Sequence, residues 1–293
     1  MSALQILVTE LEQDRSLGEP DRLRQRIEAL DHLEAYLLGE PGQVDGSEPT
    51  IEAGLYDRAR AISAKLEGIN CELYQAVRRE IQRGAGPDLL RRWAPGSGRN
   101  GGAASRVSGE GYDYLDVLIC GVLQFDEPDA EVAELAAEMV FYQPTPARHI
   151  LDLLGRLALT ERDVLVDIGS GLGHVPLLAS IRWGARSVGI ELLAAYVDCA
   201  RRSARALNLT NVTFVQQDAR SADYSSGTVF YLYTPFIGTI LRAVLDSLRR
   251  EASGREIRVC TYGPCTSTVA EEPWLEVVGT VETDRTAIFH SRD

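Results

Sequence analysis

The sequence predicts an α/β protein in which an all-helical domain precedes a mostly parallel sheet. Three observations carry this prediction. Apolar residues recur at helical spacing throughout residues 2–93. From Asp163 onward, short apolar runs of strand character alternate with amphipathic helical stretches, which implies right-handed crossovers between parallel strands. The last two apolar runs, 274–281 and 286–290, are joined by a turn at 283–285 and are expected to form an antiparallel pair.

The N-terminal residues carry three apolar stripes, and the core of a helix bundle is their simplest interpretation. The third stripe continues past Ile81 and fits either one long helix or two. The stripes consist of Leu4, Val8 and Leu11, of Leu23, Ile27, Leu30, Leu33 and Leu37, and of Ile51, Leu55, Ala59, Ile62 and Leu66.

These patterns divide the chain into four parts. Residues 1–93 are expected to form the helical domain, and residues 94–111, rich in glycine and arginine, a flexible linker. Residues 112–141 form a helical connection, and residues 142–293 form the α/β domain. Its parallel strands are expected at 164–168, 187–190, 212–215, 228–233 and 257–262.

Composition narrows the classes of function. A formal net charge of −13 argues against a broad phosphate-binding face, because nucleic-acid affinity rests on lysine and arginine side chains that neutralise phosphates. The five cysteines show no spacing typical of a zinc or redox site, so no metal is expected. No run approaches the ~18 apolar residues of a membrane span, and residues 1–10 lack the features of a secretion signal. We therefore expect a cytoplasmic protein with no membrane association.

A glycine-rich turn follows the first expected strand, and a helical pattern begins directly after it. The three glycines are Gly169, Gly171 and Gly173. A strand, a glycine turn and a helix N-terminus together form the usual nucleotide cradle of an open α/β sheet. The dinucleotide fingerprint requires a glycine where this chain has His174. The acid before the turn, Asp167, suits a ligand that carries an ammonium group and a sulfonium better than it suits a pyrophosphate.

Further candidates follow the next strands. Glu191 lies about twenty residues beyond the turn, where a carboxylate can accept both hydroxyls of a ribose. The alternative for Glu191 is a cap on the helix that starts at Leu192. Asp218 can accept from the exocyclic amine of adenine, with the backbone of Ala219 available to the ring nitrogens. All these positions fall at the carboxyl edge of the sheet, where ligands bind in such folds.

In these motifs, residues 142–293 resemble the class I S-adenosylmethionine-dependent methyltransferases. Asp167, the alternating glycines, Glu191 and Asp218 match the cofactor motifs of that superfamily in order and spacing. The terminal strand pair matches its seven-stranded, Rossmann-like sheet. The resemblance implies S-adenosylmethionine as the methyl donor and S-adenosylhomocysteine as the product. The cofactor-binding residues that it implies are Tyr142, Thr145, Asp167, Gly169, Ser170, Gly171, Gly173, Glu191, Asp218, Ala219 and Tyr233.

The segment Tyr142-Gln-Pro-Thr-Pro146 resembles the entry loop of the non-SET histone lysine methyltransferases, in which this loop folds over the cofactor. That resemblance implies that Tyr142 and Thr145 contact the methionine end. The basic histone-binding regions of those enzymes have no counterpart here. A local alternative explains the same residues, with Thr145 as N-cap and Pro146 at the first position of a helix over 147–157.

The acceptor is expected beyond the fourth strand. Amino-methyltransferases of nucleic acids carry an N/D/S-P-P-Y/F motif there, whereas this chain has Tyr233 at the polar position and Thr234 in place of the first proline. This departure disfavours nucleic-acid methylation. Tyr233 is expected to orient the acceptor, and Thr234, Pro235, Phe236 and His174 are candidate substrate contacts. A place in the core is the alternative for Phe236, and a structural role at a helix start is the alternative for His174.

The resulting hypothesis is a methyltransferase that acts on a small molecule or a protein side chain. Because the sulfonium of the donor is already activated, positioning contributes most and a dedicated base is optional. The alternatives are a non-catalytic module that binds S-adenosylmethionine or a partner, and a nucleic-acid amino-methyltransferase. A nicotinamide oxidoreductase is disfavoured by His174 and by the terminal strand pair. The acceptor atom, the oligomeric state and the role of the acidic N-terminal helices stay open at this point.

Overall fold

The computed structural model describes residues 1–38, 49–86, 107–109, 111–125, 138–140 and 142–292. The chain divides into two compact units, Met1–Val77 and Arg78–Asp293. Most of the linker predicted at 94–111 lies outside the described residues, as do residues 126–137 and 141 of the helical connection predicted at 112–141. Within the described part of the chain, no helix has the length and apolar character needed to cross a membrane.

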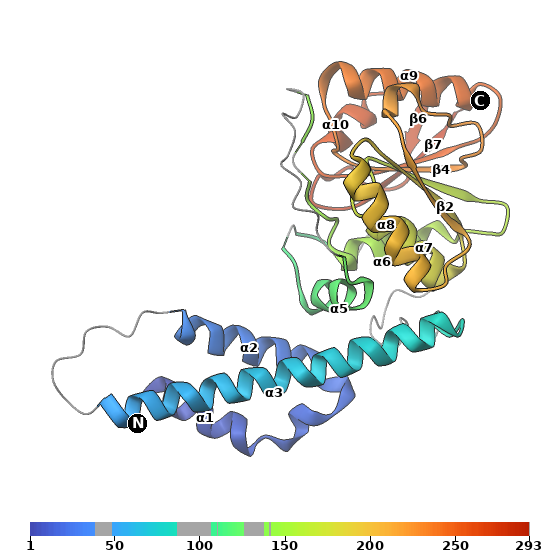
Figure 1. Ribbon diagram of the computed structural model, residues 1–293. Coiled ribbons are helices and arrows are strands. Elements are labelled where there is room, and N and C mark those ends of the chain that lie inside the picture. The colour runs from blue at the N-terminus through green and yellow to red at the C-terminus, as the bar shows by residue number, and fades with distance from the viewer. Residues whose placement is uncertain (39–48, 87–106, 110, 126–137, 141, 293) are drawn as a thin grey trace. The chain divides into compact units, whose positions relative to one another are not determined.

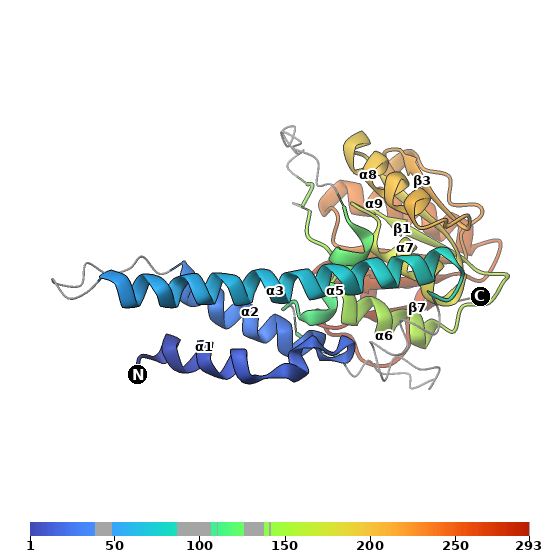
Figure 2. The ribbon, with the colours of Figure 1, turned by 60° about the horizontal axis from the view of Figure 1, so that its bottom comes forward.

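The first unit is built from helices that run alongside one another (Figures 1 and 2). Helix α1 (Ala3–Gln13) and helix α2 (Leu23–Leu37) pack against α3 (Pro49–Gln82), and two 3-10 turns, η1 (Arg15–Gly18) and η2 (Pro20–Arg22), connect the first two helices. The third apolar stripe therefore forms one continuous helix. Buried residues of this core include Leu4, Val8, Leu17, Ala29, Leu33, Ala59 and Leu66.

A buried arginine in α2 was not predicted by the apolar stripes. The Nε atom of Arg26 donates to Oδ1 of Asn70 at 2.6 Å, and its Nη1 donates to the carbonyl oxygens of Leu17 and Glu19 at 3.0 and 2.6 Å. A buried charge is tolerated when its donors find acceptors. A bond from Nη2 to the Pro20 carbonyl at 3.5 Å completes the set, so each nitrogen of the guanidinium has an acceptor and the 3-10 turns are joined to α2 and α3.

The second unit contains a seven-stranded sheet with the order β3-β2-β1-β4-β5-β7-β6. The five parallel strands of the prediction are confirmed as β1 (Val164–Ile168), β2 (Arg186–Glu191), β3 (Val212–Gln216), β4 (Val229–Tyr233) and β5 (Arg258–Tyr262). Strands β1 and β4 are neighbours, and the chain continues from β1 to β2 on one side of this pair and from β4 to β5 on the other side. A crevice therefore opens at the carboxyl ends of these two strands.

The predicted antiparallel pair is confirmed, with β7 (Ala287–Ser291) between β5 and β6 (Leu275–Val277). The first strand of the pair is shorter than the predicted 274–281. Beyond it, Gly279 takes a φ of 95°, a backbone conformation that is incompatible with a continuing strand.

Helices cover both faces of this sheet (Figure 1). Helices α9 (Gly238–Ala252) and α10 (Cys265–Ala270) pack on the face that carries Val166, Phe230 and Val259. The opposite side carries α6 (Ala147–Leu157), α7 (His174–Trp183) and α8 (Ala194–Ala206), with α5 (Tyr114–Leu123) packed against α6. Because successive side chains of a strand alternate between faces, Asp167 and Tyr231 point away from the α9 core.

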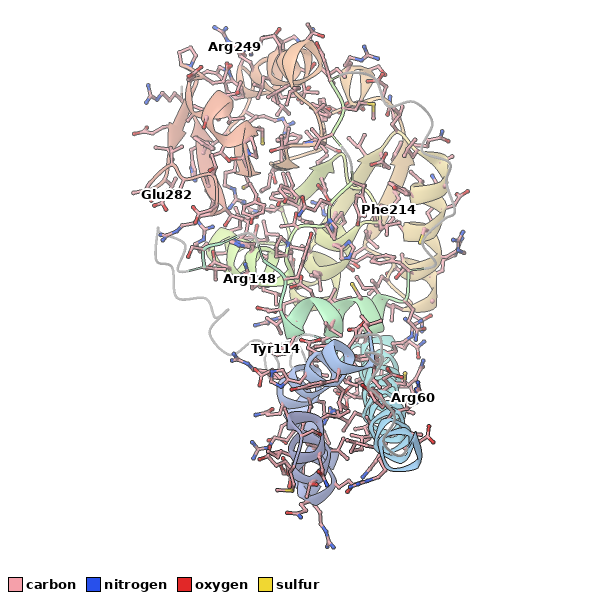
Figure 3. All side chains as sticks on the ribbon, turned by 90° about the vertical axis from the view of Figure 1, so that its left-hand side faces the viewer. Arg60, Tyr114, Arg148, Phe214, Arg249 and Glu282 are labelled. Carbon is pink, nitrogen blue, oxygen red and sulfur yellow. The ribbon has the colours of Figure 1, made fainter. Side chains whose placement is uncertain are left out.

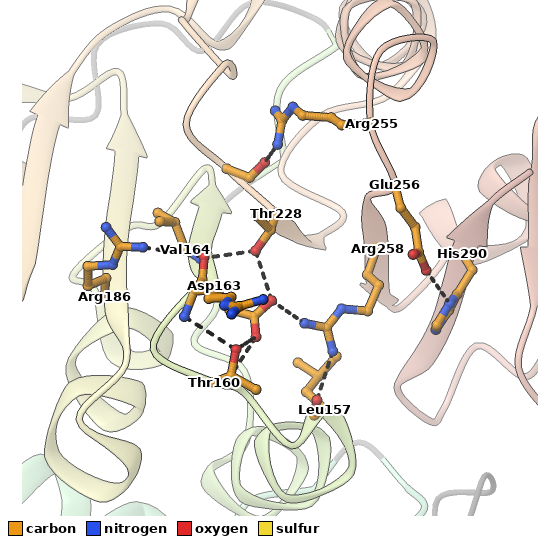
Figure 4. Close-up of polar contacts among 12 residues, drawn as sticks. Leu157, Thr160, Asp163, Val164, Arg186, Thr228, Arg255, Glu256, Arg258 and His290 are labelled. Carbon is orange, nitrogen blue, oxygen red and sulfur yellow. Dashed lines mark hydrogen bonds and ion pairs between the residues drawn. The ribbon is translucent and has the colours of Figure 1, made fainter. Parts of the chain in front are cut away.

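At the amino ends of the strands, Asp163 joins three parts of the domain (Figure 4). Its Oδ2 accepts from the backbone N–H and the hydroxyl of Thr160, each at 2.8 Å, and its Oδ1 accepts from the Thr228 hydroxyl at 3.0 Å and from Arg258 Nη2 at 2.5 Å. Although burial acts to raise the pKa of Asp163, the hydrogen bonds from Thr160 and the charge of Arg258 hold it below its ordinary value. This hydrogen-bond network joins the amino ends of β1, β4 and β5, at the edge of the sheet opposite the crevice.

Candidate functional site

A pocket of about 830 Å³ lies at the carboxyl ends of β1, β2 and β4. Its walls come from these strand ends, from the turn η3 (Ala219–Ser221) and from residues 138–140 and 142–146, which we call the entry segment. The predicted site residues that line it are Tyr142, Thr145, Asp167, Gly169, Ser170, His174, Glu191, Asp218, Ala219, Tyr233, Thr234, Pro235 and Phe236. The tertiary structure therefore brings together residues from five separate segments of the sequence.

The glycine turn requires glycine for both its backbone and its packing. Its three glycines have positive φ values of 78°, 52° and 87°. A Cβ at Gly169 would collide with the Pro235 ring, and one at Gly171 would collide with the Tyr142 ring. A Cβ at Gly173 would lie 2.5 Å from the ring of Phe214, a β3 side chain labelled in Figure 3. Gly171 thus supports the pocket wall through Tyr142, whereas Gly173 packs against Phe214, and neither glycine is among the lining residues.

The Glu191 carboxylate is fixed by backbone donors on both sides. The Gly171 N–H donates to Oε2 at 2.9 Å, and the Leu193 N–H donates to Oε1 at the same distance. Leu193 is the N-cap residue of α8, which begins at Ala194 and not at the predicted Leu192, so this acid accepts from the N-cap N–H and also contacts the glycine turn. Each carboxylate oxygen retains a lone pair, and both can still accept from a ligand.

Asp167 lies at the carboxyl end of β1 and is 4% exposed. Burial raises the pKa of this carboxyl well above its ordinary value, and the nearby charge of Glu191 raises it further. Two carboxyl groups in one poorly hydrated place favour a ligand that brings positive charge. Such a ligand would lower the pKa of Asp167 and draw it into the ionised form.

Asp218 is paired with an arginine that the sequence interpretation did not single out. Its Oδ2 accepts from Arg220 Nη2 at 2.6 Å, and its Oδ1 accepts from the Arg220 N–H at 2.8 Å, which caps η3. The side-chain hydrogen bond with Arg220 holds the pKa of Asp218 below its ordinary value. Arg220 also lines the pocket. The spacing in the sequence could have predicted this pair, since an arginine two residues after an acid at a strand end is well placed to bind it.

The entry segment is held by side-chain hydrogen bonds, and one sequence expectation about it is wrong. Thr145 does not cap α6: its Oγ1 lies 2.8 Å from the Tyr231 hydroxyl, and the N-cap position belongs to Pro146, which makes no side-chain cap bond. The Asp116 carboxylate takes over this function and accepts from the Ala147 N–H at 2.7 Å. A more distant carboxylate thus frees the threonine to face the sheet.

The first part of the entry segment pairs with the chain that leaves β4. The Val140 N–H donates to the Pro235 carbonyl at 3.2 Å, and the Ile237 N–H donates to the Glu138 carbonyl at 2.9 Å. The Glu138 carboxylate accepts from the Thr239 hydroxyl and from the Ile240 N–H, at 2.7 and 3.0 Å, at the start of α9. These bonds place the entry segment along one side of the pocket.

Another short segment is tied to the start of α6 near the end of β5. The Gly109 carbonyl accepts from Arg148 Nη2 at 2.7 Å and from the Tyr262 hydroxyl at 3.3 Å, and it lies 2.8 Å from His149 Nε2. Figure 3 shows Arg148 in this region of the domain. The ring of His149 lies 4.6 Å from that of Tyr262, so these contacts back an aromatic residue of the pocket wall.

The end of the pocket near β4 and β5 is aromatic. The rings of Tyr233 and Tyr262 lie 4.7 Å apart, and Tyr231 lines the same wall. Thr234 has a φ of 36° and turns its hydroxyl inward, where it accepts from the Cys265 N–H at 3.0 Å. Phe236 is 5% exposed and belongs to the core beneath α9 while bordering the pocket. The sequence did not indicate that Tyr231 and Tyr262 line the pocket, because aromatic residues within a strand usually belong to the core.

The Tyr142 ring lies at the glycine turn. Its hydroxyl is 3.2 Å from His174 Nδ1, and its ring is 5.2 Å from that of Tyr196. His174 is the first residue of α7, so the helix-start alternative for it is confirmed. It is also 8% exposed and borders the pocket.

Comparisons with known proteins agree with this geometry. Residues 137–227 match the family model described as histone methylation protein DOT1. No curated protein matches the chain. Among solved structures, the chain is similar to an RNA methyltransferase from Salinibacter ruber in complex with S-adenosylhomocysteine (27% identity, 51% of this chain, 92% of that chain, TM-score 0.41). It is also similar to a precorrin-6y C5,15-methyltransferase from Geobacter metallireducens (20% identity, 53% and 92%, TM-score 0.40).

The matched residues 137–227 contain the entry segment from Glu138 onward, the glycine turn, Glu191 and Asp218. These are the parts that meet around the pocket, on a sheet that has the expected strand order and the antiparallel terminal pair. The fold is therefore that of the class I methyltransferases, and the family match supports S-adenosylmethionine as the cofactor.

Proposed function

We propose that this chain transfers a methyl group from S-adenosylmethionine to a small molecule or a protein side chain, with the donor held in the pocket at the carboxyl ends of β1, β2 and β4. The observation that carries the proposal is the meeting of Asp167, Glu191, Asp218 and the entry segment around this one pocket. S-adenosylmethionine carries an amino acid, a sulfonium, a ribose and an adenine. The residues present offer a complementary group for each polar part.

The proposed roles follow from position and hydrogen-bonding capacity. Asp167 accepts from the ammonium group, directly or through water, and Glu191 accepts from the ribose hydroxyls with the lone pairs that its backbone bonds leave. Asp218 and the backbone of Ala219 face the adenine. Ser170 Oγ is buried at the pocket and has no hydrogen-bond partner in the described structure, so it is available to the amino-acid end. Further cofactor contacts come from Tyr142, Thr145, Tyr233 and the backbone of Gly169, while Gly171 and Gly173 give the turn its shape.

The bound cofactor supplies an activated methyl group, so the chain has to position the acceptor and exclude water. Tyr233 is proposed to orient the acceptor, with Thr234, Pro235, Phe236 and His174 as neighbouring contacts. The DOT1 family match supports a protein side chain as the acceptor, and the net charge of −13 disfavours nucleic acid. The inward-turned hydroxyl of Thr234 supports a role in shaping this wall.

Calorimetric titration tests the donor site. We expect S-adenosylhomocysteine to bind the wild-type protein and NAD not to bind. Asp167→Asn and Glu191→Gln should each weaken S-adenosylhomocysteine binding by about tenfold or more, because each removes a charge-assisted hydrogen bond. The matched control is Asp246→Asn on the exposed side of α9, which loses only a surface ion pair with Arg242. Binding of NAD alone would contradict the proposal.

A second experiment identifies the acceptor class. A cell extract incubated with the protein and with methyl-labelled S-adenosylmethionine is divided and treated with protease or with nuclease. Label that is released by protease, or that is found among small molecules, agrees with the proposal. Label released by nuclease indicates a nucleic-acid methyltransferase, and binding of S-adenosylhomocysteine without any labelled product indicates a non-catalytic binding module.

A further inference from the structure

The Tyr142 side chain is built into the glycine turn. A Cβ at Gly171 would lie 2.1 Å from Cε2 and 2.5 Å from Cδ2 of Tyr142, so one edge of the ring lies against this residue. The Tyr196 ring of α8 lies at 5.2 Å on another side of Tyr142. The pocket wall therefore includes an aromatic ring where a glycine turn otherwise exposes bare backbone to its ligand.

His174 connects this ring to the scaffold. Its Nδ1 lies 3.2 Å from the Tyr142 hydroxyl, and its ring lies 4.7 Å from the ring of Phe125, which follows the C-terminal end of α5. As the first residue of α7, it is also joined to the turn through Gly173. Three segments that are far apart in the sequence thus meet at one buried imidazole.

We propose that His174 is a positioning residue of the donor site, which accepts a hydrogen bond from the Tyr142 hydroxyl and thereby holds the Tyr142 ring against the glycine turn. This inference rests on the proposed function, because it assigns the ring to the wall that binds the donor. His174 thus acts on the methyl donor through the Tyr142 side chain.

The state of the imidazole is consistent with this role. Burial lowers the pKa of His174 to about 4, so the ring is neutral at physiological pH and one of its nitrogens can accept a hydrogen bond. A neutral ring also adds no positive charge beside a cationic ligand, whereas a protonated ring would repel it and could not accept from the tyrosine hydroxyl.

A double-mutant cycle tests the coupling, with the dissociation constant of S-adenosylhomocysteine as the readout. Tyr142→Phe and His174→Leu should each weaken binding by about three- to tenfold, the range of one hydrogen bond. The double variant should bind about as well as the weaker single variant, because both changes remove the same interaction. His174→Gln keeps a side-chain oxygen acceptor and should recover most of the affinity. Independent losses that multiply in the double variant, with no recovery by glutamine, would overturn the inference.

A control from the same helix separates positioning from general stability. Ser180→Ala removes a part-buried hydrogen bond between the Ser180 hydroxyl and Asn211, and Ser180 does not line the pocket. It should lower the melting temperature and leave the dissociation constant unchanged. If Ser180→Ala weakens binding as much as His174→Leu does, the effect at His174 is one of stability alone and the inference fails.

The hydrogen bond can also be observed without a ligand. The imidazole ¹⁵N resonances of His174 should shift when Tyr142 is changed to phenylalanine, because Nδ1 loses its donor. Unchanged resonances would contradict the inference and leave the proposed function intact. A wild-type protein that shows this coupling and fails to bind S-adenosylhomocysteine would instead contradict the proposed function.

Discussion

The Thr145 hydroxyl lies 2.8 Å from the Tyr231 hydroxyl, and this buried hydrogen bond joins the entry segment to the middle of the sheet. Tyr231 is paired in register with Asp167 on the neighbouring strand. The bond therefore anchors the segment beside the acid that is proposed to bind the ammonium group. Its partners are separated by 86 positions in the sequence.

Removal of either hydroxyl leaves the other buried and without its partner. Thr145→Val and Tyr231→Phe should each lower the free energy of unfolding by about 1–3 kcal/mol, since an unsatisfied buried hydroxyl carries its full desolvation cost. The double variant should be less destabilised than the sum of the single variants. Urea unfolding at pH 7.5 measures all three differences. Strict additivity would mean that the two hydroxyls do not depend on each other.

Asp167→Asn should stabilise the ligand-free protein and weaken ligand binding. Burial raises the pKa of Asp167 in the folded state. The free energy of unfolding therefore falls as the pH rises from the pKa of Asp167 in the unfolded chain through its pKa in the folded protein. Asparagine removes this cost, and the melting temperature at pH 7.5 should rise. The affinity for S-adenosylhomocysteine should fall at the same time. A variant that melts below the wild type would contradict this account of the site.

Asp163 should govern acid stability from the opposite edge of the sheet. The pKa of Asp163 is lowered in the folded state. Its contribution to the free energy of unfolding is therefore complete above its pKa in the unfolded chain, and it is lost as the pH falls through its pKa in the folded protein. Asp163→Asn should cost about 1–3 kcal/mol at pH 7, because the bond from Arg258 loses its ionic partner. The cost should shrink at pH 3 in urea unfolding, and an equal cost at both pH values would show that the charge is not involved.

The two glycines Gly171 and Gly184 form a matched pair for alanine substitution. Both have positive φ, 52° and 64°, but a Cβ at Gly184 meets nothing within 4 Å, whereas one at Gly171 meets the Tyr142 ring. Gly184→Ala should cost about 1–2 kcal/mol of backbone strain. Gly171→Ala should cost more and should abolish S-adenosylhomocysteine binding. Equal melting temperatures would show that Tyr142 moves aside without cost.

Much of the fold could be predicted from periodicity. The alternation of strands and helices after Asp163 predicted the parallel strands, and the two final runs predicted the antiparallel pair. The length of β6 was overestimated, because a positive φ at Gly279 depends on the local path of the chain. The buried charge of Arg26 was missed, since hydrophobic stripes do not show which polar side chains find partners inside.

The elements with a local signal can be predicted from the sequence: the glycine turn, the acids at the strand ends and the class of fold that joins them. The partners of these residues depend on the three-dimensional fold. Thr145 faces Tyr231 because Asp116 caps the helix instead, and Tyr142 occupies the glycine turn because His174 and Gly171 make a place for it. Local propensity acts over a few neighbouring residues, whereas hydrogen bonds across 31 or 86 positions exist only once the sheet has brought their partners together.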